Sequence, residues 1–267
     1  MSRFIYAFVI SSLFLLGCGR AQNFQSSPSA GQQQAQPPAT ATPPPVARPS
    51  TAPNLTVCAH HGVTNGTDVS DYDPNTQWSA VHNGGYQFAF IKATEGTTFK
   101  NSLFDSDWAA ALNAGVIRGA YHFFHPGDDP VAQAQFFLAT IGSLQRNDLP
   151  PVLDWEVTDG MSASVQIQNA QIWLQQVESA TGKTPIIYVD PSFWNQLGNP
   201  PEFVRYPLYI ANYGVTCPSI PPPWNTWAFW QTGIGPVPGL QSVQADLDVF
   251  NGILSAPFIP PLLMKLD

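Results

Sequence analysis

Short apolar runs alternate with polar stretches along most of the chain, and eight of these runs have the length and composition of β-strands. Many are rich in β-branched or aromatic residues, and they end in polar or aromatic side chains. A short apolar run bounded by turn residues is typical of a strand buried in a sheet. The eight predicted strands are Gly66–Ser70, Gln87–Ala93, Val116–Phe124, Pro151–Val157, Thr184–Val189, Pro207–Tyr213, Thr226–Gln231 and Ala245–Phe250.

Apolar residues recur at helical spacing between the earlier strands. The segments Leu103–Ala114, Val131–Ile141 and Ser164–Thr181 each gather apolar side chains on one face. The two later connections, 214–225 and 232–244, are rich in Pro and Gly and cannot hold a full helix.

Strands that alternate with helices favour parallel pairing, and eight such strands favour a closed barrel. We therefore predict an α/β fold, an irregular β/α barrel with about five strand–helix units followed by three strands without helices.

The first residues of the chain differ from the rest in amino-acid composition. Arg3 precedes an apolar run over residues 4–16, which is too short to span a bilayer of about 30 Å but suits a secretory signal. The run ends in Leu-Leu-Gly-Cys18, which resembles a bacterial lipoprotein signal. We predict a signal peptide over residues 1–17 and lipidation of Cys18. An ordinary cleaved signal that contains a cysteine is the alternative.

Residues 19–56 consist mainly of Gln, Ala, Pro, Ser and Thr, and such a segment cannot bury enough apolar surface to fold. We predict a disordered tether over residues 18–56, with a reach of up to about 100 Å at roughly 3.1 Å per residue. A disordered leader with no spacing role is the alternative. The folded domain is predicted over residues 57–267.

Charge and cysteine content limit the partners. The chain has 10 basic and 18 acidic side chains and a net charge of −8. Binding to nucleic-acid phosphates depends on positive charge, so we exclude a nucleic-acid partner.

Three cysteines in an exported protein leave one unpaired, and lipidation of Cys18 would account for it. Cys58 and Cys217 then form a candidate disulfide, with two unrelated buried thiols as the alternative.

Acidic, amide and aromatic side chains stand near the carboxyl ends of the predicted strands, where a β/α barrel places its active site. They are Asp68, Glu95, Tyr121, His122, Asp154, Glu156, Tyr188, Asn212, Tyr213, Trp230, Gln231, Asp246 and Asp248. Aromatic rings cover the apolar faces of a pyranose, and acids and amides bond its hydroxyl groups. The pattern indicates a sugar ligand.

The segment Leu153-Asp154-Trp155-Glu156 carries the sharpest chemical signal. Successive side chains of a strand point to opposite faces, so both carboxyl groups should point into the barrel while Trp155 faces the helices. Two carboxyl groups in one low-dielectric pocket cannot both ionise cheaply, so one should hold a proton near neutral pH. Glycoside hydrolysis needs this division of roles. An acidic pair in a polar layer of the core is the alternative.

Six strings follow one another in register from about Gly66 to Gly252. They are Asp68-Val69-Ser70, Ile91-Lys92-Ala93-Thr94-Glu95-Gly96, Gly119-Ala120-Tyr121-His122-Phe123, Pro151-Val152-Leu153-Asp154-Trp155-Glu156, Phe229-Trp230-Gln231 and Asp246-Leu247-Asp248-Val249-Phe250. Each string is weak alone, but together they resemble the strand motifs of glycoside hydrolase family 25. These are the Chalaropsis-type lysozymes, also found as bacteriophage endolysins.

The resemblance implies an N-acetylmuramidase that cuts the β-1,4 bond between N-acetylmuramic acid and N-acetylglucosamine. Glu156 would be the general acid, and Asp154 would orient it or the 2-acetamido group of the substrate. Asp68 and Asp246 would complete the acidic cluster.

The resemblance and the strand ends also suggest substrate-binding residues, namely Glu95, Tyr121, Tyr188, Tyr213, Trp230 and Gln231. For Glu95 the alternative is a structural acid paired with Lys92 or a backbone amide. For Tyr121 and Tyr188 the alternative is simple core packing, and His122 is expected to be structural.

The chain departs from the family pattern at three places. Asp73 stands where the family usually has Gln, Gln77-Trp78 stands at an Asp-Trp pair, and Asp248 stands where Asn is common. An extra acid beside the cleft could change the preference for the modification state of the glycan.

Two other functions stay open at this point. One is a glycosidase of another 2-acetamido polymer, such as a chitin-like chain. The other is a non-catalytic glycan-binding lipoprotein, although binding alone does not require both Asp154 and Glu156.

No Cys or His spacing suits zinc, so we expect no metal and no cofactor. We expect a monomer that contacts peptidoglycan glycan strands, and the membrane only through its N-terminal lipid. It would be exported, and either anchored to a bacterial membrane facing the cell wall or secreted.

Overall fold

The computed structural model describes residues 52–59 and 61–254. The predicted signal peptide, the lipidation site Cys18 and nearly all of the predicted tether lie outside the described residues. Within the described part of the chain, no helix is both long enough and apolar enough to cross a membrane.

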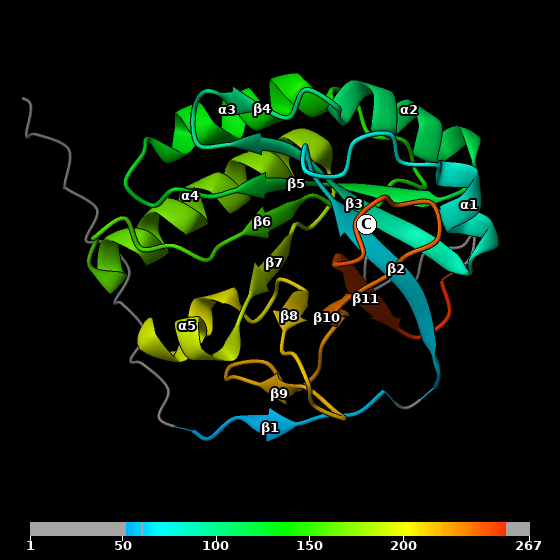
Figure 1. Ribbon diagram of the computed structural model, residues 1–267. Helices are drawn as coiled ribbons and strands as arrows, with labels where there is room; N and C mark the ends of the chain where they lie inside the picture. Colours follow the sequence, from blue (N-terminus) through cyan, green and yellow to red (C-terminus); the bar gives the residue numbers. More distant parts are fainter. Residues whose placement is uncertain (1–51, 60, 255–267) are drawn as a thin grey trace, which may run out of the picture. The chain divides into compact units, whose positions relative to one another are not determined.

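Eight strands form a closed barrel, as the sequence predicts (Figure 1). Because β2 pairs with β3 on one side and with β11 on the other, the sheet closes on itself. In spatial order the strands are β2 (Val63–Val69), β3 (Tyr86–Glu95), β5 (Ile117–Phe123), β6 (Val152–Asp154), β7 (Ile186–Val189), β8 (Leu208–Ala211), β10 (Phe229–Gly235) and β11 (Ala245–Asn251).

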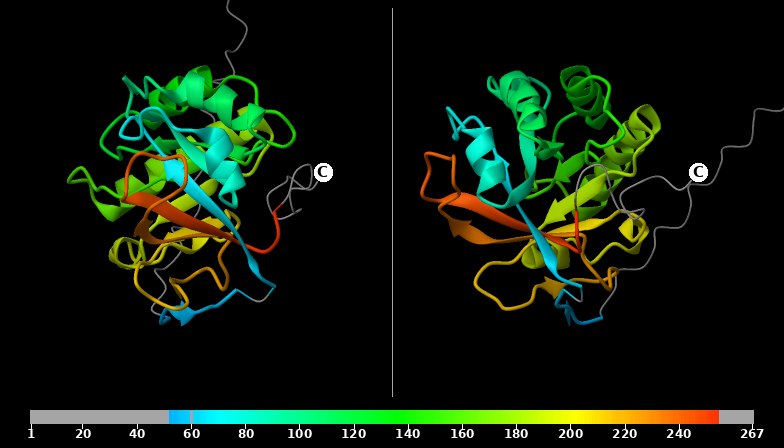
Figure 2. Two further views of the ribbon diagram at one scale, coloured as in Figure 1. Left: turned by 45° about the vertical axis from the view of Figure 1, so that its right-hand side comes forward. Right: turned by 90° about the vertical axis from the view of Figure 1, so that its right-hand side faces the viewer.

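Five helices alternate with the first six barrel strands, while β10 and β11 run without a helix between them (Figure 2). The predicted five strand–helix units are confirmed. The helices are α1 (Trp78–Asn83), α2 (Phe104–Asn113), α3 (Pro130–Ile141), α4 (Ala163–Thr181) and α5 (Pro191–Gln196), with a 3-10 helix, η1, at Pro201–Phe203.

Local signals fix several helix ends. Asp129 caps α3 by accepting hydrogen bonds from the Val131 and Ala132 amides, and Pro130 occupies the first helical position. Gly182 ends α4 with a φ of 69°, a conformation that suits glycine.

The last strand differs from the predicted parallel arrangement. β11 runs antiparallel to both of its neighbours, β10 and β2. Its connection to β10, residues 236–244, is too short for the crossover of a dozen or more residues that parallel neighbours need. The chain therefore turns back as a hairpin.

A small two-stranded sheet attaches the beginning of the described chain to the barrel. β1 (Leu55–Thr56) pairs antiparallel with β9 (Ser219–Ile220). Next to it, Cys58 and Cys217 form a disulfide with their Cα atoms 4.7 Å apart, which confirms the candidate pairing. A second short pair joins β4 (Phe99–Lys100) to the end of β3.

Aromatic rings fill the barrel interior. Phe88, Phe90 and Phe229 pack edge to face, with ring centroids 5.0–5.9 Å apart. Glycine makes room for two of these rings, because a Cβ at Gly66 or Gly119 would lie about 2.5 Å from Phe88 or Phe90, respectively. The apolar layer stops below the carboxyl ends of the strands, where the polar site begins.

Candidate active site

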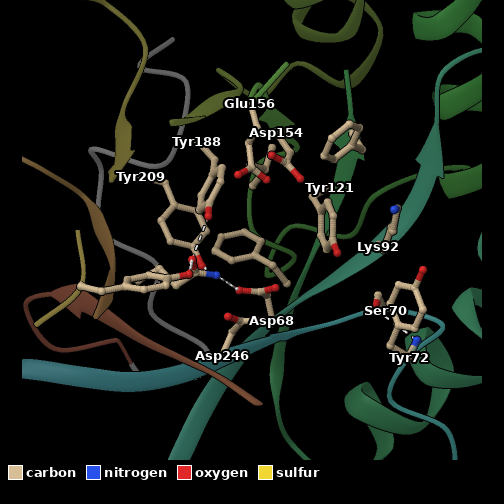
Figure 3. A pocket seen from close by; sticks show the side chains of 15 residues that line it. Asp68, Ser70, Tyr72, Lys92, Tyr121, Asp154, Glu156, Tyr188, Tyr209 and Asp246 are labelled. Atoms are coloured by element: carbon tan, nitrogen blue, oxygen red, sulfur yellow. Dashed lines mark hydrogen bonds between the residues drawn. The ribbon is translucent and has the colours of Figure 1, made fainter. Parts of the chain in front are cut away.

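A pocket of about 300 Å³ opens at the carboxyl ends of the barrel strands (Figure 3). It contains four carboxyl groups and five tyrosines, and Lys92 is the one basic side chain among the described residues that line it. The lining residues are Asp68, Ser70, Tyr72, Phe90, Lys92, Tyr121, Phe123, Val152, Asp154, Glu156, Tyr188, Tyr209, Tyr213, Gln231 and Asp246.

Strand alternation explains how Asp154 and Glu156 reach the pocket. The intervening Trp155 is fully buried on the other side of β6, where its ring packs edge to face against Phe193 and Trp194. This aromatic packing holds the end of β6 in place, so the two carboxyl groups are carried by a rigid segment.

The acidic pair shares a proton. Asp154 is 8% exposed, and its Oδ1 atom has no hydrogen-bond partner among the described residues. Burial, followed by the charge of Glu156, raises the pKa of Asp154 well above its ordinary value. Glu156 is exposed at the pocket mouth, and loss of water around its carboxyl group raises its pKa as well. The hydrogen bond between the two carboxyl groups raises the pKa of Asp154 further and lowers that of Glu156, so a proton that the pair shares favours Asp154.

Asp68 and Asp246 lie opposite this pair (Figure 3). Burial raises the pKa of Asp68 to about 6, although hydrogen bonds from Gln231 Nε2 at 2.7 Å and Tyr209 OH at 3.3 Å favour its ionised form. Burial and the charge of Asp68 raise the pKa of Asp246 to about 8. At neutral pH, Asp68 is therefore mostly ionised and Asp246 mostly protonated.

Gln231 connects the two sides of the pocket. While its Nε2 donates to Asp68, its Oε1 accepts hydrogen bonds from Tyr188 OH at 2.8 Å and from Tyr213 OH. With both ends of the amide bonded, its orientation is fixed and both tyrosine rings are held at the pocket wall.

Glu95 lies beside the pocket rather than in its lining. Its carboxylate accepts a hydrogen bond from Lys92 Nζ at 2.6 Å and lies 3.4 Å from His125 Nε2. Partial burial acts against ionisation, but Lys92 and His125 outweigh it and lower the pKa of Glu95. Glu95 therefore pairs with Lys92, which itself lines the pocket, and its role in substrate binding stays a prediction.

Comparison with known proteins adds to this geometry. The family model described as glycosyl hydrolases family 25 matches residues 67–240. The chain is 36% identical to an N,O-diacetylmuramidase of Arthroderma benhamiae over 75% of this chain and 88% of that protein. It is 35% identical to Lysozyme M1 of Streptomyces globisporus over 70% and 67%, respectively. The chain belongs to glycosyl hydrolases family 25.

Solved structures agree with this family assignment. The bacterial lysozyme of Streptomyces coelicolor superposes with a TM-score of 0.70 at 35% identity, covering 75% of this chain and 96% of that one. A family 25 lysozyme from Aspergillus fumigatus gives 0.67 at 33% identity, covering 72% and 96%. The protein is accordingly a glycoside hydrolase of the lysozyme type.

A second predicted substrate-binding residue of this family 25 enzyme, Trp230, also lies outside the pocket lining. Trp230 was expected to line the glycan groove, but its neighbours Phe229 and Gln231 point into the barrel, so its own ring points outward. There it packs against Trp227 and donates its Nε1 hydrogen to the Asn212 carbonyl at 2.9 Å. The expectation for Trp230 is corrected.

The structure adds pocket residues that sequence reasoning missed. Tyr209 lies two positions from Ala211 on β8 and points inward, which strand alternation back from Tyr213 could have revealed. Ser70 and Tyr72 come from the loop after β2, where no periodic pattern exists.

The two unusual acids lie just outside the pocket lining. Asp73 accepts a hydrogen bond from the Ser70 amide at 3.1 Å and so stabilises the turn after β2. Asp248 is 2% exposed, and burial, followed by the charge of Asp68, raises its pKa well above the ordinary value. Across the described residues, no group of three or more His, Cys, Asp or Glu side chains is arranged to hold a metal ion.

Proposed function

We propose that the protein hydrolyses peptidoglycan by cleaving the β-1,4 bond between N-acetylmuramic acid and N-acetylglucosamine. The observation that carries the proposal is the proton-sharing pair Asp154 and Glu156, set in a sugar-sized pocket with two further acids. Similarity to proteins named lysozyme and N,O-diacetylmuramidase supports this substrate.

Glu156 is assigned as the general acid. It is the exposed member of the pair, so its proton can reach the glycosidic oxygen, whereas Asp154 is nearly buried. Proton transfer from Glu156 to that oxygen lets the C–O bond break without releasing an alkoxide. Asp154 then stabilises the position of Glu156 or of the 2-acetamido group.

Two routes for the attack on the anomeric carbon follow from the pocket. In the assisted route, the 2-acetamido carbonyl oxygen of the substrate attacks, held by Asp154. In the direct route, ionised Asp68 attacks or activates a water molecule. We favour the assisted route, which the family resemblance implies.

Identification of the reaction products tests the bond specificity. Purified peptidoglycan is digested, the new reducing ends are reduced with borohydride, and the fragments are analysed by mass spectrometry. We expect reduced muramic acid at the new ends. Reduced glucosamine at the new ends would overturn the bond assignment, and preferred cleavage of chitin would favour the other 2-acetamido polymer.

The N-terminal sequence supports a location for this activity. We propose that the chain is exported and that lipid on Cys18 holds it at a bacterial membrane, where the tether lets the monomeric barrel reach the wall. Its seven basic and eighteen acidic side chains after residue 56 provide no attraction to an anionic wall, so a covalent anchor would supply proximity.

A further inference from the structure

Four side chains of alternating charge form a row that runs from the active-site pocket to the surface beside it. Lys92 lies at the inner end, where its Nζ donates to Glu95 Oε2 at 2.6 Å. Glu95 Oε1 lies 3.4 Å from His125 Nε2, and His125 Nδ1 lies 3.2 and 3.3 Å from the two carboxyl oxygens of Asp159. The exposed fraction of the side chain rises from 11% at Lys92 to 30% at His125. We call these four residues the charge row.

The inner end of the charge row acts on the acidic pair. Lys92 projects from β3 into the lining of the active-site pocket (Figure 3). Its ammonium nitrogen lies 5.3 Å from the ring centres of both Phe99 and Phe123. Burial raises the pKa values of Asp154 and Glu156, and the charge of Lys92 acts in the opposite direction. The position of Lys92 therefore affects how firmly the pair holds its proton.

The outer end of the charge row holds the connection that carries Glu156. Asp159 lies in the same connection between β6 and α4 as Glu156. Its φ of 46° is uncommon for a residue other than glycine. Besides its contact with His125, Asp159 Oδ2 accepts a hydrogen bond from the Gly127 amide at 3.1 Å. These two contacts fasten the connection to the loop after β5.

His125 can donate to both of its neighbours only as an imidazolium ion. The charged ring has two N–H groups, whereas the neutral ring has one. Because Glu95 lies at Nε2 and Asp159 at Nδ1, loss of the proton removes one of the two hydrogen bonds. Partial burial acts against the charge, but Asp159 and Glu95 outweigh it and raise the pKa of His125 above its ordinary value of 6.5.

Two further titratable groups lie near the ring. On β5, burial lowers the pKa of His122 to about 4, so this second ring is neutral where His125 titrates. Asp128 lies beside the turn at Gly96, where an added Cβ would be 3.0 Å from Asp128 Oδ2 and 3.4 Å from His125 Cδ2. The charged and titratable groups around His125 are thus Lys92, Glu95, His122, Asp128 and Asp159.

We propose that His125 is a positioning residue for the hydrolysis, and that its charged form ties Glu95, and through it Lys92, to the connection that carries Glu156. The inference rests on the proposed function and adds a residue outside the pocket lining. Since the tie needs the imidazolium ion, it is complete below the pKa of His125 and is lost as pH rises through that value. The rate should therefore depend on a proton that the acidic pair does not hold.

NMR titration of the ring protons of His125 in the full chain tests whether the ring holds this proton. We expect a pKa above 6.5 in the parent, and a lower pKa in Asp159→Asn, which lacks one carboxylate partner. A pKa at or below 6.5 in the parent would overturn the proposal. This result does not depend on the folding of any variant.

Rates on soluble peptidoglycan strands test the positioning role. For the parent and His125→Gln, kcat/KM is measured about one pH unit below and one above the His125 pKa found by NMR, where the ring is mostly charged and mostly neutral, respectively. Both proteins keep Asp154 and Glu156, so titration of the acidic pair largely cancels in the ratio of their rates. We expect the parent to be roughly fivefold faster at the lower pH and about equal to the variant at the higher pH.

His82→Gln is the matched control, because His82 is a partly exposed histidine on α1 outside the active-site pocket. Its rate relative to the parent should be the same at both pH values. An active parent whose ratio to His125→Gln does not change with pH would refute this inference alone, since a neutral structural histidine gives that result. A parent that releases no reducing ends from peptidoglycan would refute the proposed function and this inference with it.

Discussion

Asp154 and Glu156 differ in exposure although they lie two positions apart at the end of one strand. The buried member cannot easily lose a proton to water, and the exposed member can pass one to a ligand. Their hydrogen bond therefore connects Asp154, which retains a proton, to Glu156, which can donate one to a ligand. The carboxyl groups of Asp68 and Asp246 surround the same space, so each change of charge in the pocket affects the others.

Glu156→Gln should lower turnover on peptidoglycan by roughly 10²–10⁴-fold, because the amide keeps the size of the side chain but has no proton to transfer. Binding of glycan and the thermal melting temperature should be unchanged. Turnover is measured by release of reducing ends, with Asp105→Asn on α2 as the control, since Asp105 is exposed and outside the pocket. Activity within tenfold of the parent would remove Glu156 from the acid role.

Removal of the acetyl group separates the two routes of attack. If the substrate's own carbonyl oxygen attacks, fully deacetylated peptidoglycan should be cut far more slowly than the acetylated polymer, and Asp154→Asn should slow cleavage of the acetylated polymer. Rates on both polymers are compared for the parent and for this variant. Efficient cleavage of deacetylated polymer, together with an Asp154→Asn variant no slower than Asp105→Asn, would contradict substrate assistance.

Asp246→Asn should make the fold more stable at alkaline pH. The carboxyl group has a pKa near 4 in the unfolded chain and about 8 in the fold, so the unfolded state loses its proton first. As pH rises from 4 to 8, this difference lowers the free energy of unfolding of the parent, and the amide variant escapes that loss. Melting temperatures at pH 4 and pH 8 check the sign. A difference between variant and parent that does not grow with pH would show that Asp246 titrates normally.

At the scale of elements, the sequence predicts those parts of the barrel whose pattern is local. α2, α3 and α4 contain ten or more residues and show helical periodicity, whereas α1 and α5 contain six residues each, too few for a period to appear. The direction of β11 depends on the length of the preceding loop and on closure with β2, which is a long-range constraint.

In the candidate site, too, the sequence predicts the features that depend on local pattern and misses those that depend on irregular geometry. Strand alternation predicts the inward direction of Asp154, Glu156 and Gln231, and it would also have predicted the outward direction of Trp230. The pairing of Glu95 with Lys92 could be proposed but not decided, because residues three apart on a regular strand point to opposite faces and the register shift between Lys92 and Thr94 does not show in the sequence. Tyr72 could not be found, since its loop has no regular geometry.

The disulfide next to the β1–β9 pair should contribute measurably to the stability of the fold. The Cys58–Cys217 bond closes a segment with a sequence separation of 159 residues, for which chain entropy gives an upper value of about 5 kcal/mol. The double variant Cys58→Ser and Cys217→Ser should therefore unfold at lower denaturant concentration. Activity at 25 °C should persist, because neither cysteine lines the active-site pocket. An unchanged unfolding midpoint would show that the pairing of β1 with β9 keeps these segments together without the disulfide.

At the scale of the whole molecule, the proposed anchor and the barrel have separate tasks. Cys18→Ala should release the protein from the membrane fraction while hydrolysis of soluble glycan continues at the parent rate. Fractionation of producing cells, followed by an assay of each fraction, measures both effects. A membrane fraction that does not change would mean that the apolar segment over residues 4–16, rather than lipid, holds the chain.

The disulfide also has a consequence for the timing of maturation. Thiols stay reduced in a bacterial cytoplasm, so a chain that is exported would receive this crosslink only after crossing the membrane. The disulfide next to the predicted tether would then form last, after the barrel has left the compartment in which it was made. Alkylation of free thiols before lysis, followed by mass spectrometry, should find Cys58 and Cys217 reduced inside the cell and joined outside it. A joined pair in the cytoplasm would contradict that order of events.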